Sequence, residues 1–342
     1  MKFLLTAINA KFIHSNPAIY SLRAGVGEKL QPYVELAEFT INESLESILE
    51  GIWKRQPKVI GFSCYIWNWK LIREILTELP KILPDTEIWL GGPEVTYDGP
   101  GLLREFPQVT GIMVGEGEVT FREVLEQYLR EAETAGQSEQ QPESDSTEHQ
   151  VADRRGTVAG KSMVERFGQI PGLCLASGYT APRDLTDLTT LPFLYENMEP
   201  FTNRIIYYET SRGCPYRCSY CLSSIDKKVR LRDISVVKRE LQFFLDQNVK
   251  QVKFIDRTFN CDHKHAMEIW RYIYEHDNGV TNFHFEISAD ILREEEIALL
   301  NRFRPGLAQL EIGVQSTNPE TIRAIHRVMD GDKLEKIVAA IH

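Results

Sequence analysis

The stretch TSRGCPYRCSYCLSS, residues 210–224, holds three cysteines at the spacing Cys214-x3-Cys218-x2-Cys221. It follows the apolar run 205–210, which reads as a β-strand. A structural zinc site is normally closed by four protein ligands, but no further histidine or cysteine lies nearby, and the next cysteine is Cys261. Thiolates also hold iron–sulfur clusters, and three of them on a four-iron cluster leave one iron open. The stretch therefore predicts an open, catalytic cluster site.

After this stretch, the sequence alternates between strand and helix patterns. Strands are predicted at 205–210, 251–255, 282–287 and 308–314, and helices at 233–247, 263–276, 294–302, 319–328 and 332–341. Four βα units over 205–342 indicate a parallel sheet that is too short to close a barrel. We therefore expect a fragment of a longer protein; completion by another subunit and an inactive site are the alternatives.

The cysteine spacing resembles the hallmark of the radical S-adenosylmethionine (radical SAM) superfamily, including an aromatic residue, Tyr220, before the third cysteine. The resemblance implies a partial (β/α)6 barrel in which Cys214, Cys218 and Cys221 bind a 4Fe-4S cluster. The open iron would bind S-adenosylmethionine, and electron transfer would cleave it to a 5′-deoxyadenosyl radical. A zinc knuckle or a set of redox thiols is the alternative.

Residues near the later strand ends also resemble this family, in the stretches FIDRTFN (254–260), FEIS (285–288) and LEIGVQS (310–316). Polar residues at the carboxyl ends of barrel strands are placed for function. Besides Tyr220, the resemblance implies these S-adenosylmethionine contacts: Asp256, Glu286, Ser288, Gln315 and Arg327. For each of them, a purely structural polar role is the alternative.

The first 130 residues contain five further βα units. Strands are predicted at 2–8, 34–41, 59–64, 87–92 and 111–115, and helices at 17–30, 44–55, 68–81, 99–106 and 118–133. Continuous apolar strands between helices predict a doubly wound α/β domain, and we expect flavodoxin-like strand order. Four loops, 9–16, 63–69, 91–94 and 115–118, would then share one rim, where such sheets bind ligands.

These loops resemble the cobalamin-binding domain that precedes the radical domain in one branch of the superfamily, since GGPE is followed by GEGE. The resemblance implies cobalamin contacts from Ser63, Tyr65, Trp67, Gly91, Gly92, Pro93, Glu94, Gly115, Glu116 and Gly117. His14 is a further candidate. The histidine-ligating motif Asp-x-His-x-x-Gly is not preserved around it, because Phe12 and Pro17 replace its Asp and Gly. A surface or capping role for His14 is therefore expected ahead of cobalt ligation.

Residues 131–168 separate the two series. From Glu131 to Gln150 the sequence has six acidic residues, no Lys or Arg, and no Phe, Trp or Tyr, a composition that predicts a disordered insertion. Residues 169–204 then predict a strand pair, at 170–178, and an interdomain linker.

The bulk composition limits the partners. A net charge of -10 argues against general nucleic-acid binding, and no stretch approaches the roughly 20 apolar residues of a membrane helix. No signal peptide is visible, so a cytoplasmic location is expected. The resemblance implies a small-molecule or metabolite substrate and an electron donor such as flavodoxin or ferredoxin.

The leading prediction is a cobalamin-dependent radical SAM methyltransferase acting on an unactivated carbon. A radical cyclase of the anaerobic tetrapyrrole type is the alternative enzyme. From another class, a non-catalytic cobalamin and iron–sulfur binding or sensor protein remains open.

Overall fold

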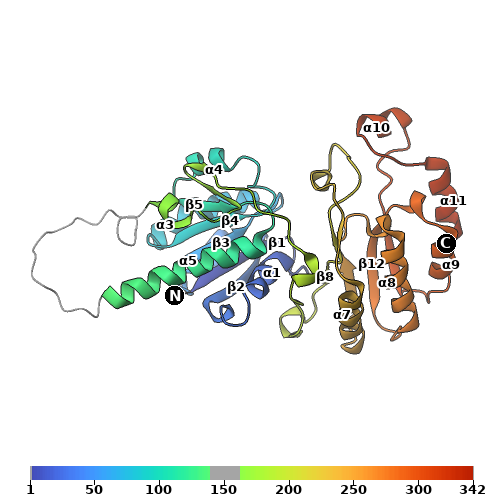
Figure 1. The fold of residues 1–342 in the computed structure, drawn as a ribbon, viewed down its shortest axis with the longest axis horizontal. Coiled ribbons are helices and arrows are strands. Elements are labelled where there is room, and N and C mark those ends of the chain that lie inside the picture. The colour runs from blue at the N-terminus through green and yellow to red at the C-terminus, as the bar shows by residue number, and fades with distance from the viewer. Residues whose placement is uncertain (1, 139–161, 342) are drawn as a thin grey trace, which may run out of the picture. The chain divides into compact units, whose positions relative to one another are not determined.

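A computed structural model describes residues 2–138 and 162–341. The protein divides into two compact units, the first comprising residues 1–186 and 192–197 and the second residues 187–191 and 198–342 (Figure 1). Each unit is an α/β structure with its own sheet, as predicted. The crossover falls at 187–198, inside the predicted linker.

The sheet of the first unit has the strand order β2-β1-β3-β4-β5-β6-β7. Its first five strands are parallel, which confirms the predicted flavodoxin-like order, and β6 and β7 add an antiparallel hairpin beside β5. The strands are β1 (Phe3–Asn9), β2 (Val34–Thr40), β3 (Val59–Ser63), β4 (Glu87–Gly91), β5 (Val109–Met113), β6 (Leu173–Leu175) and β7 (Gly178–Tyr179).

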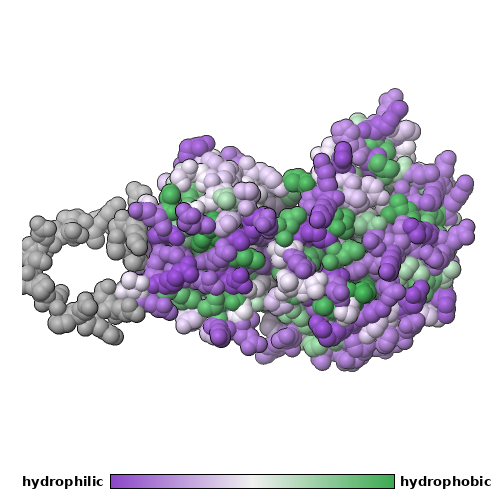
Figure 2. All heavy atoms as spheres, in the orientation of Figure 1, coloured by the Kyte–Doolittle hydropathy of each residue, from purple (hydrophilic) through white to green (hydrophobic). Residues whose placement is uncertain are grey.

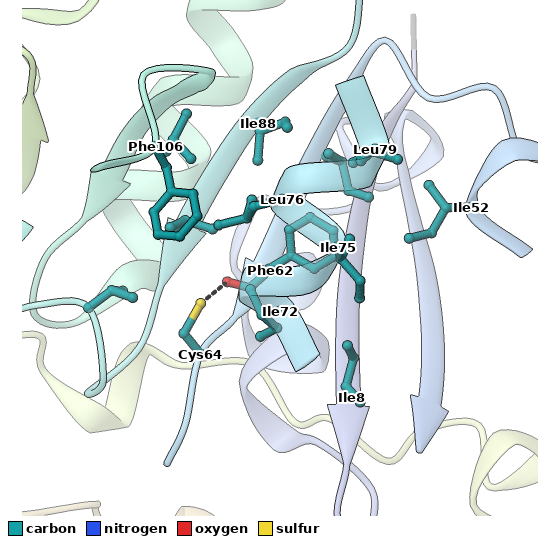
Figure 3. Packing of buried hydrophobic residues seen from close by; sticks show 14 of the residues in the cluster. Ile8, Ile52, Phe62, Cys64, Ile72, Ile75, Leu76, Leu79, Ile88 and Phe106 are labelled. Atoms are coloured by element: carbon teal, nitrogen blue, oxygen red, sulfur yellow. Dashed lines mark hydrogen bonds between the residues drawn. The ribbon is translucent and has the colours of Figure 1, made fainter. Parts of the chain in front are cut away.

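Helices cover both faces of this sheet, because alternate strand residues are apolar on each side. One apolar core joins Ile60 and Phe62 of β3 to helices α2 and α3, and includes Ile52 and Ile75 (Figure 3). A second core joins Phe3 and Leu5 of β1 to α1, α5 and α6. The helices are α1 (Pro17–Gly25), α2 (Leu45–Trp53), α3 (Trp69–Ile82), α4 (Gly99–Glu105), α5 (Gly117–Ser138) and α6 (Met163–Phe167).

The second unit has a four-stranded parallel sheet in the order β13-β12-β11-β8 and a separate two-stranded hairpin of β9 and β10. Its strands are β8 (Ile206–Tyr208), β9 (Ser211–Arg212), β10 (Arg230–Leu231), β11 (Gln251–Phe254), β12 (Asn282–Ile287) and β13 (Ala308–Ile312). Its helices are α7 (Ile234–Asp246), α8 (His263–Glu275), α9 (Glu294–Leu300), α10 (Pro319–Ala324) and α11 (Gly331–Ile341).

Aromatic packing joins helix α8 of the second unit to the sheet. The ring centroid of Phe285 lies 4.5 Å from those of both Phe254 and Phe259, and Phe259 contacts Trp270 of α8 at 5.3 Å. On the visible face of this unit, hydrophobic residues lie interspersed among hydrophilic ones (Figure 2).

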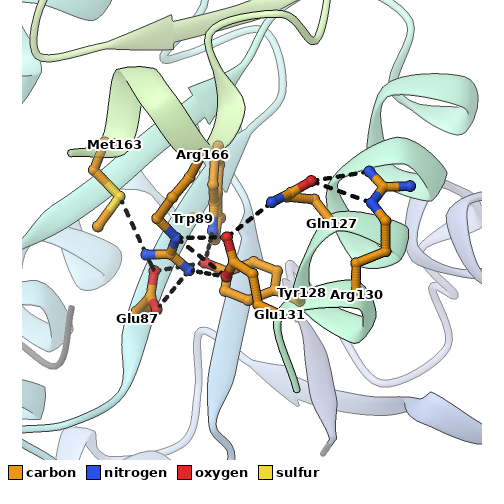
Figure 4. A network of polar contacts seen from close by, with 8 residues as sticks. All are labelled: Glu87, Trp89, Gln127, Tyr128, Arg130, Glu131, Met163 and Arg166. Carbon is orange, nitrogen blue, oxygen red and sulfur yellow. Dashed lines mark hydrogen bonds and ion pairs between the residues drawn. The ribbon is translucent and has the colours of Figure 1, made fainter. Parts of the chain in front are cut away.

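The predicted disordered insertion 131–168 differs from the structure at both ends. Helix α5 continues through residue 138, and α6 occupies Met163–Phe167. The reason is tertiary: Arg166 of α6 is buried and hydrogen-bonds Glu131 of α5 and Glu87 of β4 (Figure 4). The rest of the predicted insertion, 139–161, lies outside the described residues. No helix in the described ranges is both long and apolar enough to cross a membrane.

Candidate functional site

The three clustered cysteines lie on the loop between β9 and β10. The loop is closed at its base, where Cys214 donates its backbone N–H to the carbonyl of Asp226 at 2.9 Å. Gly213 has φ +95°, and a side chain there would place Cβ 2.5 Å from the carbonyl oxygen of Lys228. Glycine is therefore required at this position, and the backbone turns sharply just before the first cysteine.

The loop offers three thiols as donors to a metal centre. Cys214 and Cys218 are buried, Cys221 is partly exposed, and all six cysteines of the protein are free thiols. Among the described residues, no three His, Cys, Asp or Glu side chains converge closely enough to hold one metal ion. A cuboidal cluster requires less convergence, because each thiolate binds a different iron. Three free thiols on one loop are donors of the type that a 4Fe-4S cluster takes, so Cys214, Cys218 and Cys221 could hold one.

Asp256, a predicted cofactor contact, is an internal anchor. It is 1% exposed, and its carboxylate accepts hydrogen bonds from the backbone N–H of Thr210 at 3.1 Å and the hydroxyls of Thr210 and Ser211 at 2.7 and 2.6 Å. Burial raises the pKa of this carboxyl, and the hydrogen bonds oppose that effect. Because both oxygens are occupied within the protein, Asp256 joins the end of β11 to the start of the cysteine loop.

Tyr220 and Arg327 meet at the far end of the loop. Arg327 donates to the Tyr220 hydroxyl at 3.4 Å and also to the carbonyl of Gly313, just after β13. The backbone N–H of Ser219 donates to the carbonyl of Ile325 at 2.9 Å. Gln315, another predicted contact, has φ +67° beside this region. Residues 313–327 therefore hold the part of the loop that carries Cys218 and Cys221.

Ser288 and Glu286 lie at the end of β12. Asn260 exchanges two hydrogen bonds with the backbone of Ser288, at 2.9 and 3.0 Å, and the Ser288 hydroxyl donates to Asp290 at 2.8 Å. Glu286 lies 3.5 Å from Lys253 of β11. Both predicted residues are thus present at the strand ends, and each already has a partner inside the unit.

A row of charged residues crosses β11, β12 and β13, and the sequence reasoning missed most of it. Lys253 lies 3.0 Å from Glu311, and the Nε2 of His284 lies 3.0 Å from the same carboxylate. Burial, followed by the charge of Lys253, lowers the pKa of His284. The alternation of polar and apolar residues along these strands could have predicted that their polar side chains share one face of the sheet.

The predicted loops of the first unit meet at the carboxyl end of its sheet. The Asn16 side chain donates to the Ser63 hydroxyl at 3.1 Å. Asn68, fully buried, donates to the carbonyls of Ile8 and Ser63 at 3.0 and 2.9 Å and accepts from the N–H of Tyr65. Sequence reasoning had not singled out these two asparagines, which tie the first two loops together.

The GGPE loop, Gly91 to Glu94, packs on the backbone of the β3 loop. Cys64 donates its N–H to the carbonyl of Gly91 at 2.7 Å. Gly92 has φ +108°, and a Cβ on it would lie 2.5 Å from the carbonyl oxygen of Cys64. Pro93 is partly exposed and Glu94 is exposed beside it. The loop therefore needs glycine at 92 for conformation and for close approach.

The remaining residues that were predicted to contact cobalamin differ in how exposed they are and in the partners they already have. Tyr65 and Trp67 stack with centroids 4.4 Å apart, and Trp67 is 47% exposed. In the GEGE loop, Gly115 is exposed with φ +79°, and Gly117 begins α5. Glu116 accepts the backbone N–H of Thr186 at 2.7 Å, so it holds the connecting segment against this loop.

His14 lies in a turn that its own backbone closes, with its N–H 3.1 Å from the carbonyl of Lys11. It is partly exposed, while Phe12 is 62% exposed. Exposed apolar residues of the first two loops, Phe12, Ile13, Ile66 and Trp67, give this rim an apolar surface suited to a large, partly apolar ligand.

Family comparisons match both units. Residues 4–125 match the B12 binding domain family, and residues 208–342 match the radical SAM superfamily. The chain is a radical SAM protein with a B12-binding domain. The 4Fe-4S cluster, S-adenosylmethionine and cobalamin are the cofactors typical of such proteins.

Three curated relatives illustrate the range of this family. The chain is 28% identical over 228 residues to the 2-(S-pantetheinyl)-carbapenam-3-carboxylate methyltransferase of Streptantibioticus cattleyicolor, 64% of this chain and 29% of that protein. It is 26% identical to the cobalamin-dependent radical SAM methyltransferase TokK of Streptomyces tokunonensis, covering 60% and 28%. It is 23% identical to the anaerobic magnesium-protoporphyrin IX monomethyl ester cyclase of Rubrivivax gelatinosus, covering 80% and 46%. The chain thus spans less than half the length of each.

Solved structures share the fold. OxsB, a cobalamin-dependent S-adenosylmethionine radical enzyme, aligns with TM-score 0.70 at 15% identity, over 99% of this chain and 47% of that one. TsrM of Kitasatospora setae, with cobalamin and a [4Fe-4S] cluster bound, aligns with TM-score 0.66 at 18% identity, over 99% and 65%.

Proposed function

We propose that this protein cleaves S-adenosylmethionine with an iron–sulfur cluster and uses cobalamin to methylate a small-molecule substrate at an unactivated carbon. The observation that carries the proposal is the closed loop with three free thiols, in a protein that also has a B12-binding domain. When bound, the cofactors supply the 5′-deoxyadenosyl radical and the transferable methyl group.

The residues of the protein position these groups. Cys214, Cys218 and Cys221 would hold the cluster, while Asp256 and Arg327 fix the two ends of their loop. In the first unit, Gly92 would let the backbone approach the cobalamin tail, and the apolar rim would contact the corrin. We expect the contacts to S-adenosylmethionine at the ends of β12 and β13.

The test is anaerobic reconstitution with iron and sulfide, followed by addition of S-adenosylmethionine and reductant. The proposal expects 5′-deoxyadenosine, measured by mass spectrometry. Cys218→Ala should abolish cluster assembly and leave corrinoid retention intact, because the two sites lie on separate units. Cys174→Ala, a change at a buried cysteine of the first unit, is the matched control and should assemble the cluster normally. If the protein binds both the cluster and the corrinoid but forms no 5′-deoxyadenosine, the result would instead favour a binding or sensor protein.

A cyclase is the second candidate, because the cyclase of Rubrivivax gelatinosus matches 80% of this chain. Deuterium in the methyl group of S-adenosylmethionine separates the two reactions. Methyl transfer carries the label into the product or onto cobalamin, whereas ring closure leaves it in methionine.

A further inference from the structure

One segment of the first unit contacts both of the glycine-rich loops that were predicted to bind cobalamin. Residues 179–186, which we call the strap, begin with the last residue of β7 and end at Thr186, the last residue before the chain enters the second unit. Sequence reasoning predicted a linker here and gave it no role in the site. The polar contacts of the strap, followed along the chain, reach first the GGPE loop and then the GEGE loop.

The first end of the strap is fixed to the segment that follows the GGPE loop. The Tyr179 hydroxyl accepts the backbone N–H of Gly99 at 3.2 Å and donates to the carbonyl of Thr96 at 3.3 Å. Thr96 in turn donates its hydroxyl to the carbonyl of Gly92 at 2.8 Å. Two hydrogen bonds in series therefore lead from Tyr179 to Gly92, the glycine whose backbone we place next to the cobalamin tail.

Close packing holds helix α4 against the β6–β7 hairpin. Gly99 is the first residue of α4, and a side chain there would place Cβ 2.7 Å from the Sγ of Cys174 in β6. Cys174 pairs with Tyr179 across the hairpin and with Ile112 of β5 on its other side. The hairpin therefore has a fixed register on the sheet, and this register places Tyr179 beside the segment that follows the GGPE loop.

Arg183 anchors the middle of the strap to helix α5. Its side chain is 13% exposed and forms an ion pair with Glu123. It also donates to the hydroxyl of Thr120 at 2.7 Å and to the carbonyl of Pro171 at 3.1 Å. Thr120 is fully buried in the first turn of α5, which directly follows the GEGE loop. Arg183 therefore fixes the strap to the start of the helix that this loop leads into.

The last part of the strap is bound to the GEGE loop itself. The carbonyl of Ala181 accepts the N–H of Gly172 at 2.8 Å, and the carbonyl of Gly172 accepts the N–H of Val114 at 2.8 Å. Thr186 then donates its backbone N–H to the carboxylate of Glu116 at 2.7 Å. The strap is thus joined to this loop on both sides of its first glycine.

We propose that the strap is a positioning element of the corrinoid site, and that Arg183 and Tyr179 set the affinity of the first unit for corrinoids with a nucleotide tail. The inference rests on the proposed function, in which the GGPE and GEGE loops contact that tail. A loop that becomes ordered only on binding costs conformational entropy, whereas a loop that is held in place beforehand does not. Thermodynamic linkage requires the converse as well, so a bound tail should stabilise the strap.

The experiment titrates the corrinoid-free protein with cobalamin and with cobinamide, which has the corrin ring but no nucleotide tail, and follows the quenching of tryptophan fluorescence. Arg183→Met should weaken cobalamin binding at least about tenfold, the loss expected for one charge-assisted hydrogen bond. Tyr179→Phe removes only an exposed hydroxyl and should weaken cobalamin binding about threefold. Both variants should bind cobinamide as the wild type does, which also shows that the first unit is folded.

Matched controls test whether the effect belongs to the strap. Arg122→Met removes an arginine from the same helix surface, where it is 45% exposed and lies 3.9 Å from Glu126. Tyr33→Phe removes a hydroxyl from another exposed tyrosine of the first unit. Both controls should bind cobalamin and cobinamide like the wild type. Arg183→Lys keeps the charge beside Glu123 and should recover part of the affinity for cobalamin.

Amide hydrogen exchange of the wild type tests the converse. Cobalamin should slow exchange across residues 179–186, and cobinamide should leave it unchanged. Three results would overturn the proposal: equal cobalamin affinity in the wild type and Arg183→Met, equal weakening of both corrinoids, or equal affinity of the wild type for cobalamin and cobinamide. Failure of the proposed function alone looks different, because the wild type then binds cobalamin and protects the strap but transfers no methyl group.

Discussion

The buried guanidinium of Arg166 allows a quantitative test of the first unit. Its side chain is 1% exposed and donates five hydrogen bonds of 2.9–3.2 Å to the carboxylates of Glu87 and Glu131, which are 15% and 13% exposed. Tyr128, whose hydroxyl donates to Glu87, packs its ring 5.2 Å from the guanidinium (Figure 4). Replacing Arg166 by Met leaves two carboxylates facing each other in a mostly dry site.

The expected cost follows from burial. Removing one partner of a buried ion pair costs about 3–5 kcal/mol. Because both glutamates keep some contact with water, we expect the lower end, about 3 kcal/mol. For a unit of this size that loss lowers the midpoint of thermal unfolding by about 6–12 °C. Four of the five tryptophans, including buried Trp89 beside Tyr128, lie in the first unit, so tryptophan fluorescence follows its unfolding.

Two further variants make the test specific. Arg130→Met removes an exposed arginine that contacts Gln127 one turn away, and it should change stability by less than about 0.5 kcal/mol. Glu87→Gln/Glu131→Gln/Arg166→Met removes the charges together and should recover about half of the loss. A loss under about 1 kcal/mol for Arg166→Met, the range of exposed pairs, would refute the reasoning. A triple variant no more stable than the single one would do the same.

Three other predictions concern the sites. Gly92→Ala should weaken corrinoid binding at least tenfold in a titration, because the new Cβ would meet the Cys64 backbone. Gly27→Ala is the control, since Gly27 also has a positive φ but its Cβ would meet nothing within 4 Å. This variant should lose only about 1–2 kcal/mol of stability through backbone strain and should bind corrinoid normally. Asp256→Asn should lower the amount of iron bound per protein and speed amide hydrogen exchange in β9, since each hydrogen bond to a charged group contributes about 1.5–3 kcal/mol. Asp246→Asn, at an exposed position, should change neither the bound iron nor the exchange. Burial and Lys253 lower the pKa of His284, so the unfolded state takes up this proton first as the pH falls. The free energy of unfolding of the second unit should therefore decline below about pH 6.5, and urea titrations should show less decline in His284→Gln.

Local patterns were sufficient for the architecture. Strand-like runs of five to eight residues between amphipathic helices predicted the parallel order of β2, β1, β3, β4 and β5, because buried strands and their crossovers leave few arrangements. The apolar run 205–210 likewise predicted that the loop of Cys214, Cys218 and Cys221 follows a strand. Both features depend on residues that are close in the sequence, so local sequence patterns can predict them.

Long-range polar pairing was beyond sequence reasoning. The sequence predicted a cofactor contact at Asp256, but it gave no sign of the hydrogen bonds that Asp256 accepts from Thr210 and Ser211, some 45 residues away. The acidic composition after Glu131 predicted disorder, but Arg166, 35 residues later, draws Glu131 into a buried network. The neighbouring sequence does not show whether a carboxylate forms its hydrogen bonds with a cofactor or with other residues of the protein.

Strand β13 has a consequence for handling the protein. Among the strands of residues 2–138 and 162–341 it pairs with β12 alone, and none of its five residues is fully buried. Its outer row of backbone amides and carbonyls can therefore template pairing with another molecule. Exposed Glu311 is the one charged residue on this strand that discourages such contact. Concentrated samples of residues 1–342 alone should therefore self-associate through β13, and replacing Gln309 by Lys should keep them dispersed.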